Sequence, residues 1–256
     1  ADNLFRQAVN LSGVNSINWA RIIFQIVYYF YSFLRLNNKK INFSVPTGNF
    51  GDIYAGYMAK KMGLPIGKLI VATNENDILQ RVINKGIYKP SKVKASISPS
   101  MDIQVSSNFE RLLFYVLHSR DSEVKKLMHN LETKGYFKLT KHQKNIIQKD
   151  FVAFKVTNEE TKKIIKKIYE QNNFFIDPHT ATAFHAANKI KSNYPCVILG
   201  TAHPYKFLET MKSVTGKKIK KPSQVSKLMS RREKYDILNN NVNTIKKYIV
   251  GKNYEN

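Results

Sequence analysis

The chain has 256 residues, of which 43% are hydrophobic and 12% aromatic, so it holds enough apolar material for a sizeable core and is not a disordered chain. It carries 42 Lys and Arg residues against 18 Asp and Glu, a formal net charge of +24 at pH 7. The lysines are spread along the sequence and form no nucleic-acid-binding motif, so we favour compositional drift over a nucleic-acid partner. A basic surface would still steer an anionic small molecule towards the protein.

The single cysteine, Cys196, lies in the apolar run 196–199, which favours a buried residue over a nucleophile. One cysteine forms no disulfide framework within the chain, and this fits a reducing compartment. With no signal peptide visible, we expect a cytoplasmic protein. The run Ile22–Leu36 is apolar and aromatic, but it is short for a bilayer span and contains Gln25. We therefore expect a buried core helix and no membrane partner.

The first third of the chain predicts alternating helices and strands. The first helix has candidate caps at Asn15 and Ser16, and Gly63 is a plausible stop for the second. This order, with a glycine-rich turn between the first strand and the second helix, is typical of an α/β fold with parallel strands. The predicted elements are a helix over 13–36, a strand over 41–45, a helix over 53–62 and a strand over 69–73.

The rest of the chain is more variable. A basic stretch with prolines, 85–99, predicts irregular structure, and the polar, lysine-rich residues 120–150 predict an exposed helical insertion. A helix over 180–191 is rich in small residues and suits close packing. The tail from Pro222 is basic and mostly helical. Further predicted elements are a helix over 109–119, a helix over 161–172 and a strand over 196–199.

The most informative local feature is the turn Thr47-Gly48-Asn49-Phe50-Gly51-Asp52, which follows a strand and precedes a helix. Two glycines allow a sharp turn and close approach of the backbone to a ligand. The N–H groups that begin the next helix then offer hydrogen bonds to an anion. The spacing fits neither a Walker loop nor a dinucleotide fingerprint. A phosphate cradle and an ordinary strand–helix turn are about equally supported by this spacing.

Two further turns carry candidate groups. Thr201 and His203 follow the strand that ends at Leu199, where α/β sheets bind ligands. Thr201 is also a good capping residue, and on pattern alone the cap is favoured. Asp177 or Thr180 is a candidate cap for the small-residue helix. The histidines and Cys196 do not have zinc-ligand spacing, so no metal site is expected. The serines of 96–107 lack the glycines of a nucleophile elbow.

Six motifs in order resemble those of threonine synthases, in the longer branch found in bacteria and fungi. The C-terminal tail also resembles that family's last helices. The motifs are Asn15-Ser16-Ile17-Asn18-Trp19-Ala20-Arg21, Val45-Pro46-Thr47-Gly48-Asn49-Phe50-Gly51-Asp52, Ala72-Thr73-Asn74-Glu75-Asn76-Asp77, Ser98-Pro99-Ser100-Met101-Asp102-Ile103 with Val105–Arg111, Asp177-Pro178-His179-Thr180-Ala181, and Thr201-Ala202-His203-Pro204 with Lys206-Phe207.

The resemblance implies a tryptophan-synthase-β-like fold, the fold type II of pyridoxal-phosphate enzymes, of which this chain is the C-terminal part. It implies a lyase that acts on a carbon–oxygen bond to phosphate and converts O-phospho-L-homoserine and water to L-threonine and phosphate. The cofactor, pyridoxal 5'-phosphate, is held as a Schiff base on a lysine and serves as an electron sink. The same lysine is the expected proton shuttle.

Site residues follow from the resemblance position by position. Gly48, Asn49, Phe50, Gly51 and Asp52 match the cradle of the cofactor phosphate, and Thr201 matches the hydroxyl that faces the pyridine nitrogen. A second group lies in a motif of the active-site region and is expected to bind substrate: Ser106, Asn108 and Arg111.

The sequence departs from the family where the cofactor lysine is concerned. It has no Ala-Phe-Lys-Asp segment, and Phe137-Lys138 lies in the polar insertion and is a poor substitute. We therefore expect no catalytic residue in this chain and a Schiff-base lysine upstream. Gly200 and Tyr205 replace the more usual Ser and Ala, and Tyr205 would narrow the pocket.

These observations divide the chain into a catalytic α/β region over 1–220 that lacks the lysine segment, and a helical tail over 221–256. The expected function is that of a threonine synthase fragment. The alternative is a non-catalytic remnant that binds pyridoxal phosphate or a phosphorylated small molecule. The expected partner is the small-molecule substrate, with no nucleic acid and no membrane, and the oligomeric state is left open.

Overall fold

The structure, a computed structural model, describes residues 2–13, 15–37, 39–229 and 231–253. It divides into two compact units, Ser16–Lys220 and a smaller one made of Ala1–Asn15 and Lys221–Asn256. One boundary coincides with the predicted start of the tail, but the first 15 residues group with the tail rather than with the α/β region. The assignment of functions to the two parts of the chain stays a prediction.

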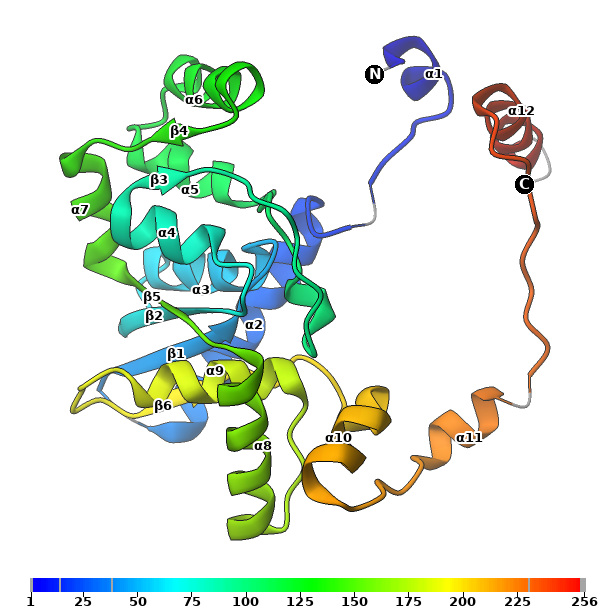
Figure 1. The fold of residues 1–256 in the computed structure, drawn as a ribbon. Coiled ribbons are helices and arrows are strands. Elements are labelled where there is room, and N and C mark those ends of the chain that lie inside the picture. Colours follow the sequence, from blue (N-terminus) through cyan, green and yellow to red (C-terminus); the bar gives the residue numbers. More distant parts are fainter. Residues whose placement is uncertain (1, 14, 38, 230, 254–256) are drawn as a thin grey trace. The chain divides into compact units, whose positions relative to one another are not determined.

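The centre of the larger unit is a four-stranded parallel sheet (Figure 1). Its order is β5-β2-β1-β6, so β1 lies inside the sheet, where Phe43 pairs with Leu69 on one side and Val197 on the other. All six residues of β1 are buried, as expected for a strand of a parallel sheet covered on both faces. The strands are β1 (Ile41–Pro46), β2 (Ile66–Thr73), β5 (Phe151–Lys155) and β6 (Cys196–Ile198).

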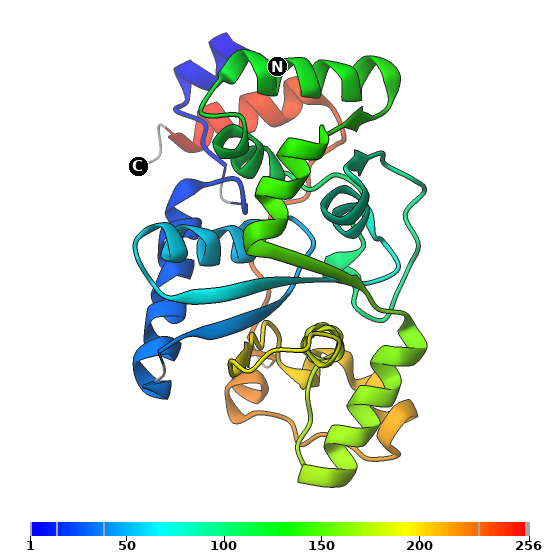
Figure 2. The ribbon, with the colours of Figure 1, turned by 90° about the vertical axis from the view of Figure 1, so that its left-hand side faces the viewer.

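Helices cover both faces of this sheet (Figure 2). On one face lie α3 (Gly51–Lys61), α4 (Ile78–Lys85) and α7 (Lys141–Asp150); on the other lies α9 (Pro178–Asn188), against which α8 (Asn158–Asn172) packs. α10 (Leu208–Thr215) packs on α8. The small residues of α9 allow the close approach that the sequence predicted: Ser44 Oγ donates to the carbonyl of Ala183 at 2.7 Å.

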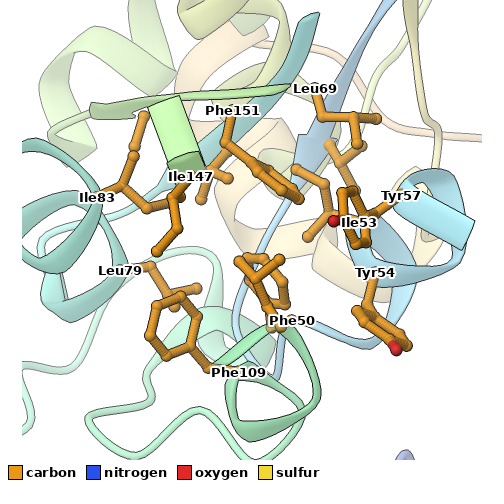
Figure 3. Packing of buried hydrophobic residues seen from close by; sticks show 14 of the residues in the cluster. Phe50, Ile53, Tyr54, Tyr57, Leu69, Leu79, Ile83, Phe109, Ile147 and Phe151 are labelled. Atoms are coloured by element: carbon orange, nitrogen blue, oxygen red, sulfur yellow. The ribbon is translucent and has the colours of Figure 1, made fainter. Parts of the chain in front are cut away.

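The main core lies between the sheet and the helices on the α3 side (Figure 3). Phe50 packs between Phe109 and Phe151, with ring centroids 5.3 and 5.5 Å away. Ile53 of α3, Leu79 of α4 and Ile147 of α7 belong to the same cluster. Phe50 lies within the glycine turn, between Gly48 and Gly51, so the core fixes the position of that turn.

The apolar helix α2 (Trp19–Leu36) packs against α3. Its cap is Asn18, whose side chain accepts from the N–H of Ala20 at 3.0 Å, rather than Asn15 or Ser16. Only Ile22 and Tyr29 are buried, so the expectation of a core helix is wrong for this chain. Tyr29 explains the contact with α3, because a Cβ on Gly56 would lie 2.5 Å from its ring. No helix in the described residues is long and apolar enough to cross a membrane.

The insertion over 120–150 is helical, as predicted, but it also contributes to the core through Phe137 and Ile147. Its two-residue strand β4 pairs antiparallel with β3, which precedes the insertion in the sequence. The remaining elements are α1 (Asn3–Ala8), β3 (Ile87–Tyr88), η1 (Pro99–Met101), α5 (Phe109–Val116), α6 (Asp121–Lys134), β4 (Phe137–Lys138), η2 (Pro204–Phe207), α11 (Ser223–Met229) and α12 (Val242–Asn253).

Candidate functional site

A cavity of about 210 Å³ lies at the carboxyl ends of β1 and β6, the edge where open α/β sheets bind ligands. It is adjoined by a second cavity of about 440 Å³ that shares Gln25, Asp52 and Thr201. The first cavity combines the glycine turn, the start of α9 and the loop after β6. Its lining residues are Ser16, Gln25, Pro46, Thr47, Gly48, Asn49, Phe50, Gly51, Asp52, Ser100, Met101, His179, Thr201, Ala202 and Lys206.

The carbonyl groups of the glycine turn are held from behind. Ser106 Oγ donates to the carbonyl of Gly48 at 2.8 Å, and both the backbone N–H and the side-chain amide of Asn108 donate to the carbonyl of Asn49 at 3.1 Å. Within the described residues, the N–H groups of 48–52 have no recorded acceptor. A turn with its carbonyls occupied and its N–H groups available has the donors that an anion requires.

Close contacts surround both glycines of the turn. A Cβ on Gly48 would lie 2.9 Å from the carbonyl oxygen of Ser100, and one on Gly51 would lie 3.3 Å from Nδ2 of Asn108. Backbone atoms do not move aside easily, so the segment containing Ser100 excludes any side chain at Gly48. These contacts are with the chain's own residues, so the predicted close approach of the turn to a ligand stays a prediction.

Phe50 is the N-cap residue of α3 and has a left-handed backbone, with φ of 62°. Such a conformation is unfavourable for a bulky residue and occurs where the surroundings impose it. Here the imposing contact is the core, which holds the ring 99% buried. The aromatic core thus maintains the backbone geometry of the turn.

The side chain of Asp52, in the first turn of α3, is hydrogen-bonded to α2. Its Oδ1 accepts from the hydroxyls of Tyr28 at 2.5 Å and Tyr29 at 3.0 Å. Burial raises the pKa of this carboxyl, and the two hydroxyl groups oppose that effect only in part. The side chain is therefore a link between the turn and α2, although the residue lines both cavities.

The start of α9 forms the opposite side of the cavity. Asp177 is the N-cap, as one of the sequence alternatives held, and accepts from the N–H groups of His179 and Thr180. The same carboxylate contacts Nδ1 of His179 at 2.9 Å, and Nε2 accepts from the N–H of Ser100 at 3.2 Å. Burial opposes ionisation of Asp177, but these hydrogen bonds hold its pKa below the usual value. His179 thus positions the segment that carries Ser100.

A buried polar cluster fixes the other end of that segment. Oδ1 of Asp102 accepts from the side-chain amides of Asn74 at 2.7 Å and Asn76 at 3.0 Å, and from Ser96 Oγ at 2.7 Å. Its Oδ2 accepts from the backbone N–H of Ser96 at 2.9 Å. Sequence reasoning quoted these residues only as motif matches, because nothing in the order of the sequence shows that they meet.

The loop after β6 brings Thr201 and Lys206 to the cavity. The short helix that follows is capped by His203, whose Nδ1 accepts from the N–H of Tyr205 at 3.1 Å. The interpretation of Thr201 as this helix's cap is therefore wrong. Lys206 adds a cation to the lining, and it was identified from the sequence only as part of a motif match. Tyr205 is not among the residues that line either cavity.

Ser106, Asn108 and Arg111 do not line these cavities. Ser106 and Asn108 support the glycine turn, as described above. Arg111 donates to Oδ1 of Asn108 at 3.0 Å and to the carbonyl of Ile17 at 2.6 Å, and its guanidinium lies over the ring of Trp19. The expected role of these three residues in substrate binding stays a prediction.

The sequence motifs did not single out one further lysine, Lys155. Ala153-Phe154-Lys155 shares three residues with the Ala-Phe-Lys-Asp core. The segment belongs to the edge strand β5, and the Nζ of Lys155 lies 3.3 Å from a carboxylate oxygen of Asp77. Neither this lysine nor Lys138 of β4 lines the cavities. Among the described residues that line the two cavities, Lys206 is the only lysine.

Comparison with known proteins shows which proteins this chain resembles. A family model, "Threonine synthase, C-terminal", matches residues 180–249. The threonine synthase of Saccharomyces cerevisiae is 43% identical over 92% of this chain and 53% of its own length, and that of Pseudomonas aeruginosa is 42% identical over 97% and 54%. The chain thus spans about half the length of the curated relatives it matches.

Solved structures give the same result. The crystal structure of pyridoxal-phosphate-bound threonine synthase from Brucella melitensis superposes with a TM-score of 0.91 and 43% identity, covering 97% of this chain and 54% of that one. The yeast enzyme gives a TM-score of 0.86 at 41% identity. The predicted fold, fold type II of pyridoxal-phosphate enzymes, is confirmed. Over nearly its whole length the chain is similar to threonine synthases, and residues 180–249 match the model for the C-terminal part of that family.

Proposed function

We propose that this chain is the part of a threonine synthase that binds pyridoxal 5'-phosphate, in an enzyme that converts O-phospho-L-homoserine and water to L-threonine and phosphate. The observation that carries the proposal is the glycine turn, whose carbonyls are occupied by Ser106 and Asn108 while its N–H groups line a cavity. The relatives' shared name and the pyridoxal phosphate of the B. melitensis structure support it.

The residues fit the cofactor group by group. A phosphate dianion suits the N–H groups of 48–52 and the positive end of α3. Thr201 offers a neutral hydroxyl on the same cavity, in a position suited to the ring nitrogen. Because a hydroxyl carries no charge, it would not hold a proton on that nitrogen as a carboxylate would. Lys206 offers a cation for a second anionic group.

Bound pyridoxal phosphate supplies an electron sink that makes the bonds at Cα of an amino acid labile. This chain's contribution is to bind and orient. The turn fixes the phosphate, Thr201 sets the polarity at the ring, and the segment with Ser100 and Met101 closes the cavity from the side of α9. The net charge of +24 favours approach of a phosphorylated substrate.

We place the Schiff-base lysine outside these 256 residues. Lys155 is paired with Asp77, and Lys206 lacks the Ala-Phe-Lys-Asp context. The chain alone is therefore expected to make no threonine from O-phospho-L-homoserine and pyridoxal phosphate. Sustained threonine formation by the purified chain would contradict this assignment.

A chimera tests the reaction itself. In it, this chain replaces the matched 54% of the B. melitensis threonine synthase, which keeps its own remaining part. We expect threonine and inorganic phosphate in equal amounts. A chimera that folds and binds pyridoxal phosphate but forms neither product would instead support the non-catalytic remnant. Replacing the remaining part's Schiff-base lysine by alanine is the matched control.

A further inference from the structure

The outer face of α2 is apolar and exposed. Residues 22–34 contain no charged side chain, although 23% of the chain is charged. Helical periodicity divides this stretch into an inner side, with Ile22 and Tyr29 buried against the rest of the unit, and an outer side. We call the outer side the α2 face, which consists of Ile23, Phe24, Val27, Tyr31 and Leu34.

Exposure of the α2 face is unusually high for such residues. Phe24 is 76% exposed, Leu34 73% and Val27 62%. Single exposed apolar side chains are normal, but a continuous apolar face along a helix marks a surface that another structure covers. Its flanking charges, Arg21 and Arg35, lie at the two ends of the helix. The face therefore has the composition of a core helix, but its side chains are exposed instead of being covered by a second layer of protein.

The same helix contributes to the candidate site. Gln25 lines both cavities, Tyr28 lines the larger one, and Tyr28 and Tyr29 bind Asp52 of the glycine turn. Phe24 and Val27 lie within one helical turn of Gln25 and Tyr28. A structure that covers the α2 face would consequently sit beside the cavity.

We propose that the α2 face docks the part of the threonine synthase polypeptide that this chain does not contain. The relatives leave a little under half of their length outside the match, which is enough protein to form the missing layer. The proposal rests on the proposed function only in taking that remainder as the occupant. Docking on α2 would bring the remainder, with its lysine, to the cavity edge.

The test uses association and surface protection, not threonine formation. The probe is the part of the B. melitensis threonine synthase outside the match, expressed separately and mixed with this chain. We expect a one-to-one complex in sedimentation experiments. The triple variant Phe24→Ser, Val27→Ser, Leu34→Ser should weaken association by roughly 30-fold or more, as loss of buried apolar anchors does. The matched control is Met62→Ser, Val93→Ser, Phe174→Ser, at other exposed apolar positions, and should leave association unchanged.

Thiol labelling identifies the occupant. Cys196 reacts slowly because burial raises its pKa to about 11, so Phe24→Cys reports on the α2 face and Met62→Cys on a control position. We expect Cys at position 24 to react freely in the chain alone and about tenfold or more slowly in the complex. Protection already present in the chain alone would assign the face to a second copy or to the chain's own tail. Protection only on anionic lipid vesicles would assign it to a membrane surface. Each of these results, like an absence of association, would overturn the proposal; failure of the chimera to make threonine would leave it standing.

Discussion

The glycine turn and the α2 face are neighbours in the fold, but they differ in how far their side chains are buried or hydrogen-bonded. At the turn, the carbonyls and side chains have partners within the chain: Ser106 and Asn108 bind two carbonyls, Phe50 is fixed by the core, and Asp52 accepts from two tyrosines, while the N–H groups are left for a ligand. On the α2 face, five large apolar side chains are exposed. The comparison teaches that this chain builds one side of the site completely and leaves its other boundary to a further structure.

A negative charge at Thr201 should have the largest effect. Thr201→Asp places a carboxylate where we expect the pyridine nitrogen, and an adjacent opposite charge raises the pKa of such a base by about 1–3 pH units, worth roughly 1.4–4 kcal/mol. The absorption spectrum of the bound cofactor and its pH titration measure this. Thr201→Ser, which keeps the hydroxyl, is the control and should behave as wild type. Unchanged spectra in Thr201→Asp would remove this residue from the site.

Substitution at Gly51 should come next. Gly51→Val introduces a Cβ 3.3 Å from the amide of Asn108 and obstructs the backbone N–H groups. Losing one charge-assisted hydrogen bond costs about 1.5–3 kcal/mol, so affinity for pyridoxal phosphate should fall roughly tenfold or more. Equilibrium titration measures it. Gly216→Asn changes a glycine with open space around it and should bind normally; equal affinity in Gly51→Val would refute the cradle.

Loss of the Asp102 carboxylate should destabilise the fold. Asp102→Ala leaves the amides of Asn74 and Asn76 without this acceptor. Both amides keep other acceptors, among them Ser98 and the carbonyl of Lys94, so the free energy of unfolding should fall by about 1.5–3 kcal/mol, the range for hydrogen bonds to a charged group. Urea denaturation provides the measurement. The control is the exposed Asp121→Ala, whose carboxylate pairs with Lys125 at the surface and which should change stability far less.

Two carboxyls beside the cavity should respond oppositely to pH. The pKa of Asp177 is lowered in the folded chain, so its stabilisation is present above the unfolded value and is lost as pH falls through the folded one. The pKa of Asp52 is raised by burial, so stability decreases as pH rises from the unfolded value through the folded one. The unfolding free energy is measured between pH 3 and 6. Asp177→Asn should remove a contribution that rises with pH, and Asp52→Asn should remove a contribution that falls with pH. Changes of the same sign would contradict these assignments.

Substitution of the α2 face should have the smallest effect on the isolated chain. Phe24→Ser removes an exposed side chain, so the unfolding free energy should change by no more than about 0.5 kcal/mol. Phe43→Ser, on the fully buried strand β1, is the contrasting variant and should cost several times more. Thermal denaturation of both variants measures the difference. A large loss from Phe24→Ser would show that this chain already covers the face.

Much of the fold followed from local pattern. The strands over 41–45, 69–73 and 196–199 and the helices flanking them match the structure closely, because buried parallel strands are short apolar runs between turn residues. Strand β5 and helix α4 were not predicted. β5 has five residues and follows the lysine-rich α7 directly, so no turn signal separates them, and its pairing with β2 is a long-range contact.

Part of the site was also predicted from local pattern. The glycine turn and Thr201 lie next to recognisable strands, so their meeting at one sheet edge follows from parallel topology. The supporting contacts do not: Asp102 with Asn74, and His179 with Ser100, join residues 28 and 79 positions apart. For α2, the prediction of a buried core helix is wrong for this chain, because an apolar pattern does not show whether a second layer of protein covers the helix.

Titration of the isotope-labelled chain with pyridoxal phosphate, followed by the backbone amide resonances, tests the central claim most directly. The account predicts that the largest shifts occur at the N–H groups of Gly48, Asn49, Phe50, Gly51 and Asp52, and that Gly51→Val abolishes them. Inorganic phosphate should shift the same amides at higher concentration. Shifts confined to the lysine-lined amino edge of the sheet, around Lys40, Lys68 and Lys149, with none in the turn, would contradict it.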